Sequence, residues 1–210
     1  MFGDVSMIRS AAKNPATSPE LTDALRASVA TKRSQVLSIL KEAATKFPAI
    51  TFANSFGAED MVLTDIIMRE KLAIEIFSLD TGRLPAETYT LMAEAESTYS
   101  TKLKVYFPKH EVVEQYVQTK GINAFYESID LRKACCHMRK VEPLQRALSG
   151  KQAWITGMRA EQATTRANLP VQEFDEGNQL EKFNPLSDWT EQEVWGYIRL
   201  HEVPYNKLHD

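Results

Sequence analysis

The chain has 210 residues, a formal net charge of −3 and only two cysteines, with 43% hydrophobic and 25% charged residues. These values describe a soluble globular chain long enough to bury one core, and they argue against a general nucleic-acid or anionic-membrane binder. No apolar run has the length of a membrane span, and the start of the chain lacks the apolar stretch of a signal peptide. We therefore expect a cytoplasmic protein whose ligand is a small anion.

The first segment, residues 1–17, is small and polar, and we expect it to be a disordered tail ahead of a single domain over residues 18–210. Ser18, Pro19 and Glu20 have the pattern of a helix N-cap followed by proline at the first helical position. Helical sequence then continues to about Lys46. The domain is thus expected to open with one or two helices.

Short β-rich runs alternate with amphipathic stretches in the rest of the chain. The expected strands lie at residues 49–54, 73–79, 104–108 and 153–158. The expected helices lie near residues 59–70, 86–99, 132–148 and 190–201, and helical sequence also follows the third expected strand through Val117. Near-continuous apolar strands that alternate with helices are typical of an α/β fold with a mostly parallel sheet and helices on both faces.

Ligands of such folds bind beyond the carboxyl ends of the strands, so the residues after each strand are the first candidates for a site. After the first expected strand come Ser55, Gly57 and Glu59. Here a hydroxyl, a flexible glycine and a helix start would present backbone N–H groups to an anion. The other interpretation is an ordinary strand-to-helix turn that Ser55 caps.

Two further strand ends carry similar residues. Leu79 and Thr81 follow the second expected strand, next to a glycine that lets a ligand approach the backbone. Gly157, Arg159 and Arg166 follow the fourth, where the arginines either bind a phosphate or sulfate or form solvated ion pairs. Three such strand ends at one edge of one sheet predict a nucleotide site.

The two cysteines, Cys135 and Cys136, are adjacent and lie in the basic segment KACCHMRK. A disulfide between neighbours would close a strained ring, which indicates a reducing compartment. Iron–sulfur ligation fits the pair best, although such clusters take four ligands; two buried thiols acting as small hydrophobes are the alternative. On a helix, Arg139 and Lys140 lie one turn beyond the two thiols and give each of them a cationic neighbour.

Five segments, in order, carry a resemblance to a known family: SFGAEDMVL, LDTGRLPAETY, KACCHMRKVEPL, TGMRAEQATTR and NPLSDWTEQEVWGYI. They resemble the assimilatory sulfonucleotide reductases. The adjacent cysteines are similar to those of the iron–sulfur branch, the adenylyl-sulfate (APS) reductases, and not to the cluster-free branch that acts on the 3′-phosphorylated substrate (PAPS). The resemblance implies an adenine nucleotide alpha hydrolase-like (Rossmann-like) fold and the reductive cleavage of APS to sulfite and AMP in sulfate assimilation, with thioredoxin as reductant.

The resemblance also implies roles for residues of the matching segments. Cys135 and Cys136 match half the ligands of a 4Fe-4S cluster. Lys140 matches a lysine between cluster and phosphosulfate, with Arg139 beside it, and both cations are implied to bind the substrate. The residues implied to bind the nucleotide are Ser55, Gly57, Glu59, Leu79, Thr81, Gly157 and Arg166.

In one respect the sequence departs from the family pattern. The family has its nucleophilic cysteine and the other two cluster ligands in a C-terminal segment, whereas the printed sequence ends at Asp210. We therefore expect the C-terminal tail to be missing from this chain and the nucleophile to lie beyond Asp210. A PAPS reductase and a non-catalytic nucleotide-binding or redox-sensing module are the alternative functions, and a homo-oligomer is compatible with the sequence.

Overall fold

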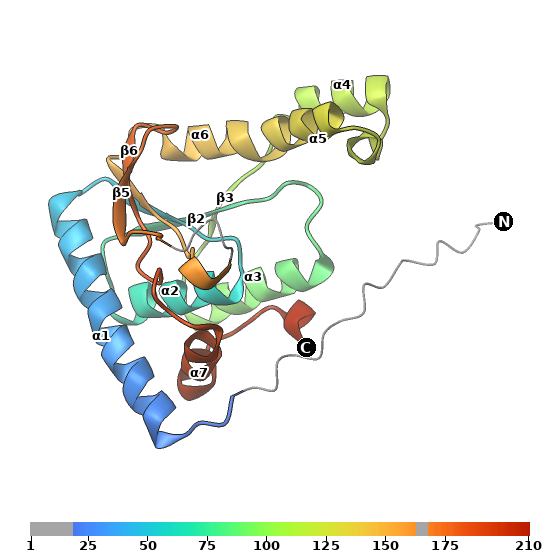
Figure 1. Ribbon diagram of the computed structural model, residues 1–210. Coiled ribbons are helices and arrows are strands. Elements are labelled where there is room, and N and C mark those ends of the chain that lie inside the picture. Colours follow the sequence, from blue (N-terminus) through green and yellow to red (C-terminus); the bar gives the residue numbers. More distant parts are fainter. Residues whose placement is uncertain (1–18, 163–167) are drawn as a thin grey trace.

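The structure is a computed structural model that describes residues 19–162 and 168–210, so the tail expected over residues 1–17 lies outside the described part (Figure 1). Its centre is a six-stranded sheet with the strand order β3-β2-β1-β4-β6-β5. Neighbouring strands are parallel except β5, which pairs antiparallel with β6 at one edge. The strands are β1 (Ile50–Ala53), β2 (Glu75–Leu79), β3 (Lys104–Tyr106), β4 (Ala153–Ile155), β5 (Gln172–Asp175) and β6 (Leu180–Phe183).

The direction in which strands are added to the sheet reverses between β1 and β4. From β1 the chain adds β2 and β3 on one side. It then returns to place β4 on the other side of β1, with β5 at the far edge and β6 between β4 and β5. In open α/β sheets such a reversal leaves a crevice beyond the carboxyl ends of the strands, where ligands bind. The loops after β1, β2 and β4 are therefore the expected location of a ligand-binding site.

Helices cover both faces of the sheet, as the sequence pattern predicts (Figure 1). Helices α1, α2, α3 and α7 lie on one face, and α4, α5 and α6 lie on the other. The first face buries the larger apolar cluster, while α6 packs Ala147 and Leu148 against Phe77 in a smaller one. The helices are α1 (Asp23–Lys46), α2 (Ala58–Arg69), α3 (Ala86–Thr98), α4 (His110–Lys120), α5 (Ile129–Cys136), α6 (Glu142–Leu148) and α7 (Glu191–His201). Within the described ranges no helix is both long enough and apolar enough to cross a membrane.

A buried carboxylate joins three elements of the larger core. Asp65 of α2 accepts hydrogen bonds from the Tyr197 hydroxyl of α7 at 2.8 Å, from the Tyr99 hydroxyl after α3 at 2.9 Å and from Arg69 Nε at 2.7 Å. A buried charge is tolerated only when it is paired and hydrogen-bonded, and here every partner is a strong donor. This network fixes α2, whose other end begins at the candidate site.

The first helix starts later than expected. The prediction that Pro19 opens the helix is wrong, because α1 begins at Asp23 and Thr22 is its N-cap. The Thr22 hydroxyl accepts a hydrogen bond from the Leu25 N–H at 3.2 Å, while the Pro19 carbonyl accepts one from Arg199 of α7. Threonine followed by an acidic first helical residue caps a helix well. Thr22 and Asp23, and not Pro19, therefore decide where α1 starts.

The cysteine-bearing segment is helical, but it is not one regular α-helix. It begins at Ile129, earlier than the expected start near Arg132, and it contains a π-helical turn over His137–Val141 between α5 and α6. Pro143 explains the turn: proline has no N–H, and its ring collides with the carbonyl four residues earlier, which is that of Arg139. The wider turn keeps the chain helical across the proline.

Candidate functional site

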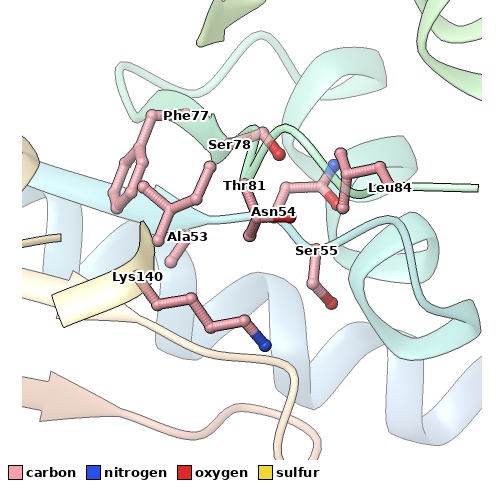
Figure 2. A pocket seen from close by; sticks show the side chains of 9 residues that line it. Ala53, Asn54, Ser55, Phe77, Ser78, Thr81, Leu84 and Lys140 are labelled. Carbon is pink, nitrogen blue, oxygen red and sulfur yellow. The ribbon is translucent and has the colours of Figure 1, made fainter. Parts of the chain in front are cut away.

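A cavity of about 200 Å³ lies at the carboxyl ends of β1 and β2 (Figure 2). Four of the residues singled out in the sequence line it together: Ser55, Leu79, Thr81 and Lys140. Figure 2 shows Lys140 reaching in from the cysteine-bearing helix toward the side on which Ser55 lies. The remaining lining residues are Ala53, Asn54, Phe77, Ser78 and Leu84. Residues far apart in sequence thus meet at the crevice that the strand order creates.

The loop after β1 is held in a fixed shape by buried side chains. Phe56 has a positive φ of 63°, which is rare for a bulky residue, and its side chain is buried in the core. Its N–H donates to Asn54 Oδ1 at 2.6 Å, and Asn54 in turn donates to the Thr64 hydroxyl at 2.9 Å. The loop leads into α2, whose N-cap Gly57 provides no side-chain cap. The start of α2 is therefore a suitable binding position for an anion.

The interpretation of Ser55 as a helix cap is wrong. Its N–H and its hydroxyl both donate to Asp60 Oδ2, at 2.7 and 2.6 Å. Asp60 also interacts with the backbone of Gly157, and a Cβ on Gly157 would lie 2.2 Å from Asp60 Oδ1. Glycine is thus required there by the close approach of a carboxylate. Asp60 joins the ends of β1 and β4, a role that its place in a helical first turn did not reveal.

Burial raises the pKa of Asp60 from 3.8 to about 6, against the opposing effect of its hydrogen bonds from Ser55. A folded-state pKa above the unfolded one means that the protonated carboxyl stabilises the fold at low pH and that this contribution is lost as pH rises through 6. Relative to Asp60→Asn, the wild type should therefore gain about 2–3 kcal/mol in free energy of unfolding as pH falls from 7 to 4. Urea unfolding of both proteins across this range measures the difference, and a constant difference would contradict the assignment.

Glu59 and Arg159 form an ion pair across the crevice. Arg159 Nε lies 2.8 Å from Glu59 Oε1, and its Nη1 lies 2.7 Å from Glu161 Oε2. The ion-pair interpretation of Arg159 is therefore confirmed, although the pair is largely buried and not solvated. Gly57, Glu59 and Gly157 are not among the residues that line the cavity of Figure 2. Arg166, the other arginine predicted for this loop, lies outside the described residues.

The loop after β2 is organised by Asp80, which the sequence reasoning did not single out. Its carboxylate accepts from the Gly82 N–H at 2.7 Å and from the Tyr89 hydroxyl at 2.9 and 3.0 Å. The Thr81 hydroxyl accepts from the Arg83 N–H at 3.2 Å. Aspartate and threonine side chains that bond to the backbone two residues on are typical of tight turns, so Asp-Thr-Gly was the available signal.

The cysteine-bearing helix, which comprises α5, the π turn and α6, presents two different sides. Cys135 and Arg139 are buried, whereas Cys136 and Lys140 are exposed, in keeping with their spacing of four residues. Lys140 lines the cavity of Figure 2, but Arg139 lines a second cavity of about 840 Å³ behind the loop after β2. Arg139 Nη1 donates to the Thr81 carbonyl at 2.6 Å. The two neighbouring cations therefore lie at different cavities.

Both cysteines are free thiols. They would supply two of the four ligands if a 4Fe-4S cluster were bound. Over residues 19–162 and 168–210 no group of three or more histidine, cysteine, aspartate or glutamate side chains is arranged to hold a metal ion. The described residues thus provide half of the donor set, and a cluster here would need two ligands from elsewhere.

The sequence is similar to that of a known protein family. Residues 49–210 match the family model described as the phosphoadenosine phosphosulfate reductase domain. An adenosine 5'-phosphosulfate reductase from Allochromatium vinosum is 52% identical over 180 residues, which cover 86% of this chain and 70% of that relative.

Solved structures give the same result for the fold. A crystal structure of phosphoadenylyl-sulfate (PAPS) reductase from Candida auris, a phosphate complex, has a TM-score of 0.71 and 32% identity and covers 82% of each chain. An NH3-dependent NAD synthetase from Campylobacter jejuni, in complex with the nitrate ion, has a TM-score of 0.58 at 9% identity over 83% of this chain and 74% of its own, a likeness in fold alone. The fold is the expected adenine nucleotide alpha hydrolase-like fold, and the chain belongs to the sulfonucleotide reductase family.

Proposed function

We propose that this chain is the nucleotide-binding part of an APS reductase, an oxidoreductase that cleaves APS to sulfite and AMP. The name of the Allochromatium vinosum relative supports this substrate. One structural observation carries the proposal: Lys140, on the helix that bears both cysteines, lines the same cavity as Ser55 and Thr81 at the strand ends. A nucleotide in that cavity would have its charged end beside the cysteine-bearing helix.

In the proposed reaction a cysteine thiolate attacks the sulfur of the APS sulfate group. The S–O bond to the phosphate breaks, AMP leaves with the electron pair, and an enzyme S-sulfocysteine forms. A thioredoxin dithiol then attacks the cysteine sulfur, sulfite leaves, and the dithiol is oxidised to a disulfide while the enzyme thiol is restored. Two electrons thus pass from thioredoxin to sulfur. Lys140 would stabilise the charge that develops on the phosphosulfate.

We further propose that Cys135 and Cys136 ligate a 4Fe-4S cluster, with the other ligands and the attacking thiol supplied from outside these 210 residues. Adjacent thiols with Lys140 one turn away suit ligation better than a disulfide. When bound, the cluster would add its charge beside Lys140 and adjust the electrostatics of the site. A thiol-dependent reaction and two free cysteines are in keeping with the reducing conditions of the cytoplasm.

Phosphate binding is assigned to the loop after β1. Gly57, the N-cap of α2, makes no side-chain cap, so N–H groups of the first turn would be available to an anion. The Glu59–Arg159 pair and Gly157 would keep this loop against β4, and Arg166 is proposed to bind the nucleotide. Leu79 and Thr81 are proposed to contact the adenosine.

Adenine nucleotides are expected to stabilise the 210-residue chain. AMP or APS at a hundred times its Kd should raise the free energy of unfolding by about 2.7 kcal/mol and shift the melting temperature accordingly. GMP is the matched control, since it carries the same phosphate on a different base. Unchanged melting of the folded chain with both adenine nucleotides would contradict the proposed site.

The same chain should nevertheless be inactive as an enzyme. Because both cysteines are assigned to iron, it is expected to release no sulfite from APS in the presence of thioredoxin and a reductant, while still binding AMP. Sulfite release is measured anaerobically beside protein that carries the proposed attacking thiol. Robust turnover by the 210-residue chain would mean that Cys135 or Cys136 is the nucleophile.

A PAPS reductase is the second candidate, favoured by the likeness to the Candida auris enzyme at 32% identity. The two candidates differ in one phosphate on the ribose. Competition between APS and PAPS for the AMP site, followed by calorimetry, separates them. Tighter binding of PAPS than of APS would exchange the first proposal for the second.

A further inference from the structure

Arg139 is a buried cation with an unusual set of partners. Its side chain belongs to a residue only 9% exposed, and Nη1 donates to the Thr81 carbonyl at 2.6 Å. Its Nε is buried without a hydrogen-bond partner, and no carboxylate in the described part of the chain pairs with it. A buried charge without a counter-ion reduces the stability of a protein, so Arg139 is expected to have a role other than stabilising the fold.

The loop that Arg139 holds separates two cavities. Thr81 and Leu84 line the cavity of Figure 2, whereas Gly82, Leu84 and Arg139 line the second cavity on the other side. Asp80 fixes this loop through the Gly82 N–H, and Arg139 fixes it through the Thr81 carbonyl. A small movement of this thin loop would change the wall of the nucleotide cavity.

The backbone of the loop and the guanidinium of Arg139 lie close to each other. Gly82 has a positive φ of 68°, and a Cβ added to it would lie 3.3 Å from Arg139 Nη1. Glycine is the residue that adopts this conformation without steric cost. The backbone of the loop and the guanidinium are therefore fitted to each other.

We propose that Arg139 is a positioning residue that sets the Thr81 peptide and thereby couples the cysteine-bearing helix to nucleotide affinity. This inference rests on the proposed nucleotide site. Arg139 does not line the cavity of Figure 2, so in place of the expected contact with substrate we assign it an action through the loop, whereas its neighbour Lys140 lines the cavity. Since such coupling is reciprocal, a change at the cysteines that moves the π turn changes AMP affinity, and bound AMP resists that change.

The test is AMP affinity by isothermal titration calorimetry. Arg139→Gln is expected to weaken AMP binding about tenfold, and Arg139→Lys, which retains a charged donor, should recover most of that loss. Arg146→Gln is the matched control and should bind as the wild type does. Arg146 also donates to a backbone carbonyl, that of Phe107, but it does not line the nucleotide cavity.

A variant on the loop side keeps the test decisive if Arg139→Gln folds poorly. Gly82→Ala disturbs the same junction, and the double variant should bind AMP no more weakly than the weaker single variant. Additive losses, or wild-type affinity in Arg139→Gln, would overturn the inference and leave the nucleotide site standing. Equal losses in Arg139→Lys and Arg139→Gln would reduce Arg139 to a structural role. No AMP binding by the wild type would overturn both proposals.

Discussion

Replacing Lys140 with alanine is expected to lower the rate of sulfite formation by about 10² in protein that carries the proposed attacking thiol. The loss follows from geometry: Lys140 lines the cavity beside Ser55 and Thr81, so its removal takes a cation from the charge that develops on the phosphosulfate. AMP affinity should fall much less, because AMP lacks the sulfate group whose charge Lys140 would bind. The measurement is initial sulfite release at saturating APS.

Lys133→Ala is the matched control for Lys140→Ala. Lys133 is an exposed lysine of α5, two residues before the cysteine pair, and it does not line the cavity. The Lys133→Ala variant changes the net charge by the same amount as Lys140→Ala and should retain nearly full activity. Lys140→Arg, which keeps a cation at the cavity, should retain part of the activity. Equal losses in Lys133→Ala and Lys140→Ala would point to a general effect of charge and not to a contact with substrate.

Serine at either Cys135 or Cys136 is expected to abolish the iron content of the protein. Wild-type protein that carries all proposed ligands should be brown after anaerobic purification and hold four irons per chain, the number that defines the cluster type. Each variant removes one thiolate of the assigned set, and a cluster with three ligands is readily lost. Iron analysis and the visible absorbance of the three proteins make the comparison.

His137→Ala provides the control for the cysteine variants. His137 follows Cys136 directly and is exposed, so its loss alters the same surface without removing a thiolate. It should keep both iron and colour. A colourless wild-type protein after reconstitution with iron and sulfide would contradict the cluster and weaken the preference for APS.

Strand-helix alternation predicted most of the fold, because a strand buried on both faces must be apolar almost throughout and a covering helix must be amphipathic. The four expected strands exist, and their carboxyl ends meet at one edge, which brings Ser55 and Leu79 to the same cavity. The local pattern did not show which of two possible helix starts the chain uses. Thr22, and not the Ser18-Pro19 pattern, caps α1.

Contacts between distant segments were not predictable from local spacing. Asp60 joins the ends of β1 and β4, and Glu59 pairs with Arg159, a residue 100 positions away. Asp60 looked like an ordinary first-turn residue of a helix, and Glu59 was expected to bind the nucleotide and not to pair with Arg159. The different surroundings of Arg139 and Lys140 depend on a loop fifty-eight positions before Arg139, which no helical spacing encodes.

The loop after β1 is already ordered by the protein itself. Phe56 is anchored in the core, Asn54 holds its N–H, and Asp60 holds both donors of Ser55. The conformational entropy of these residues is therefore lost during folding and not when a nucleotide arrives. Association at this edge of the cavity needs no prior rearrangement, so encounter with the anion, and not closure of the loop, would govern its rate.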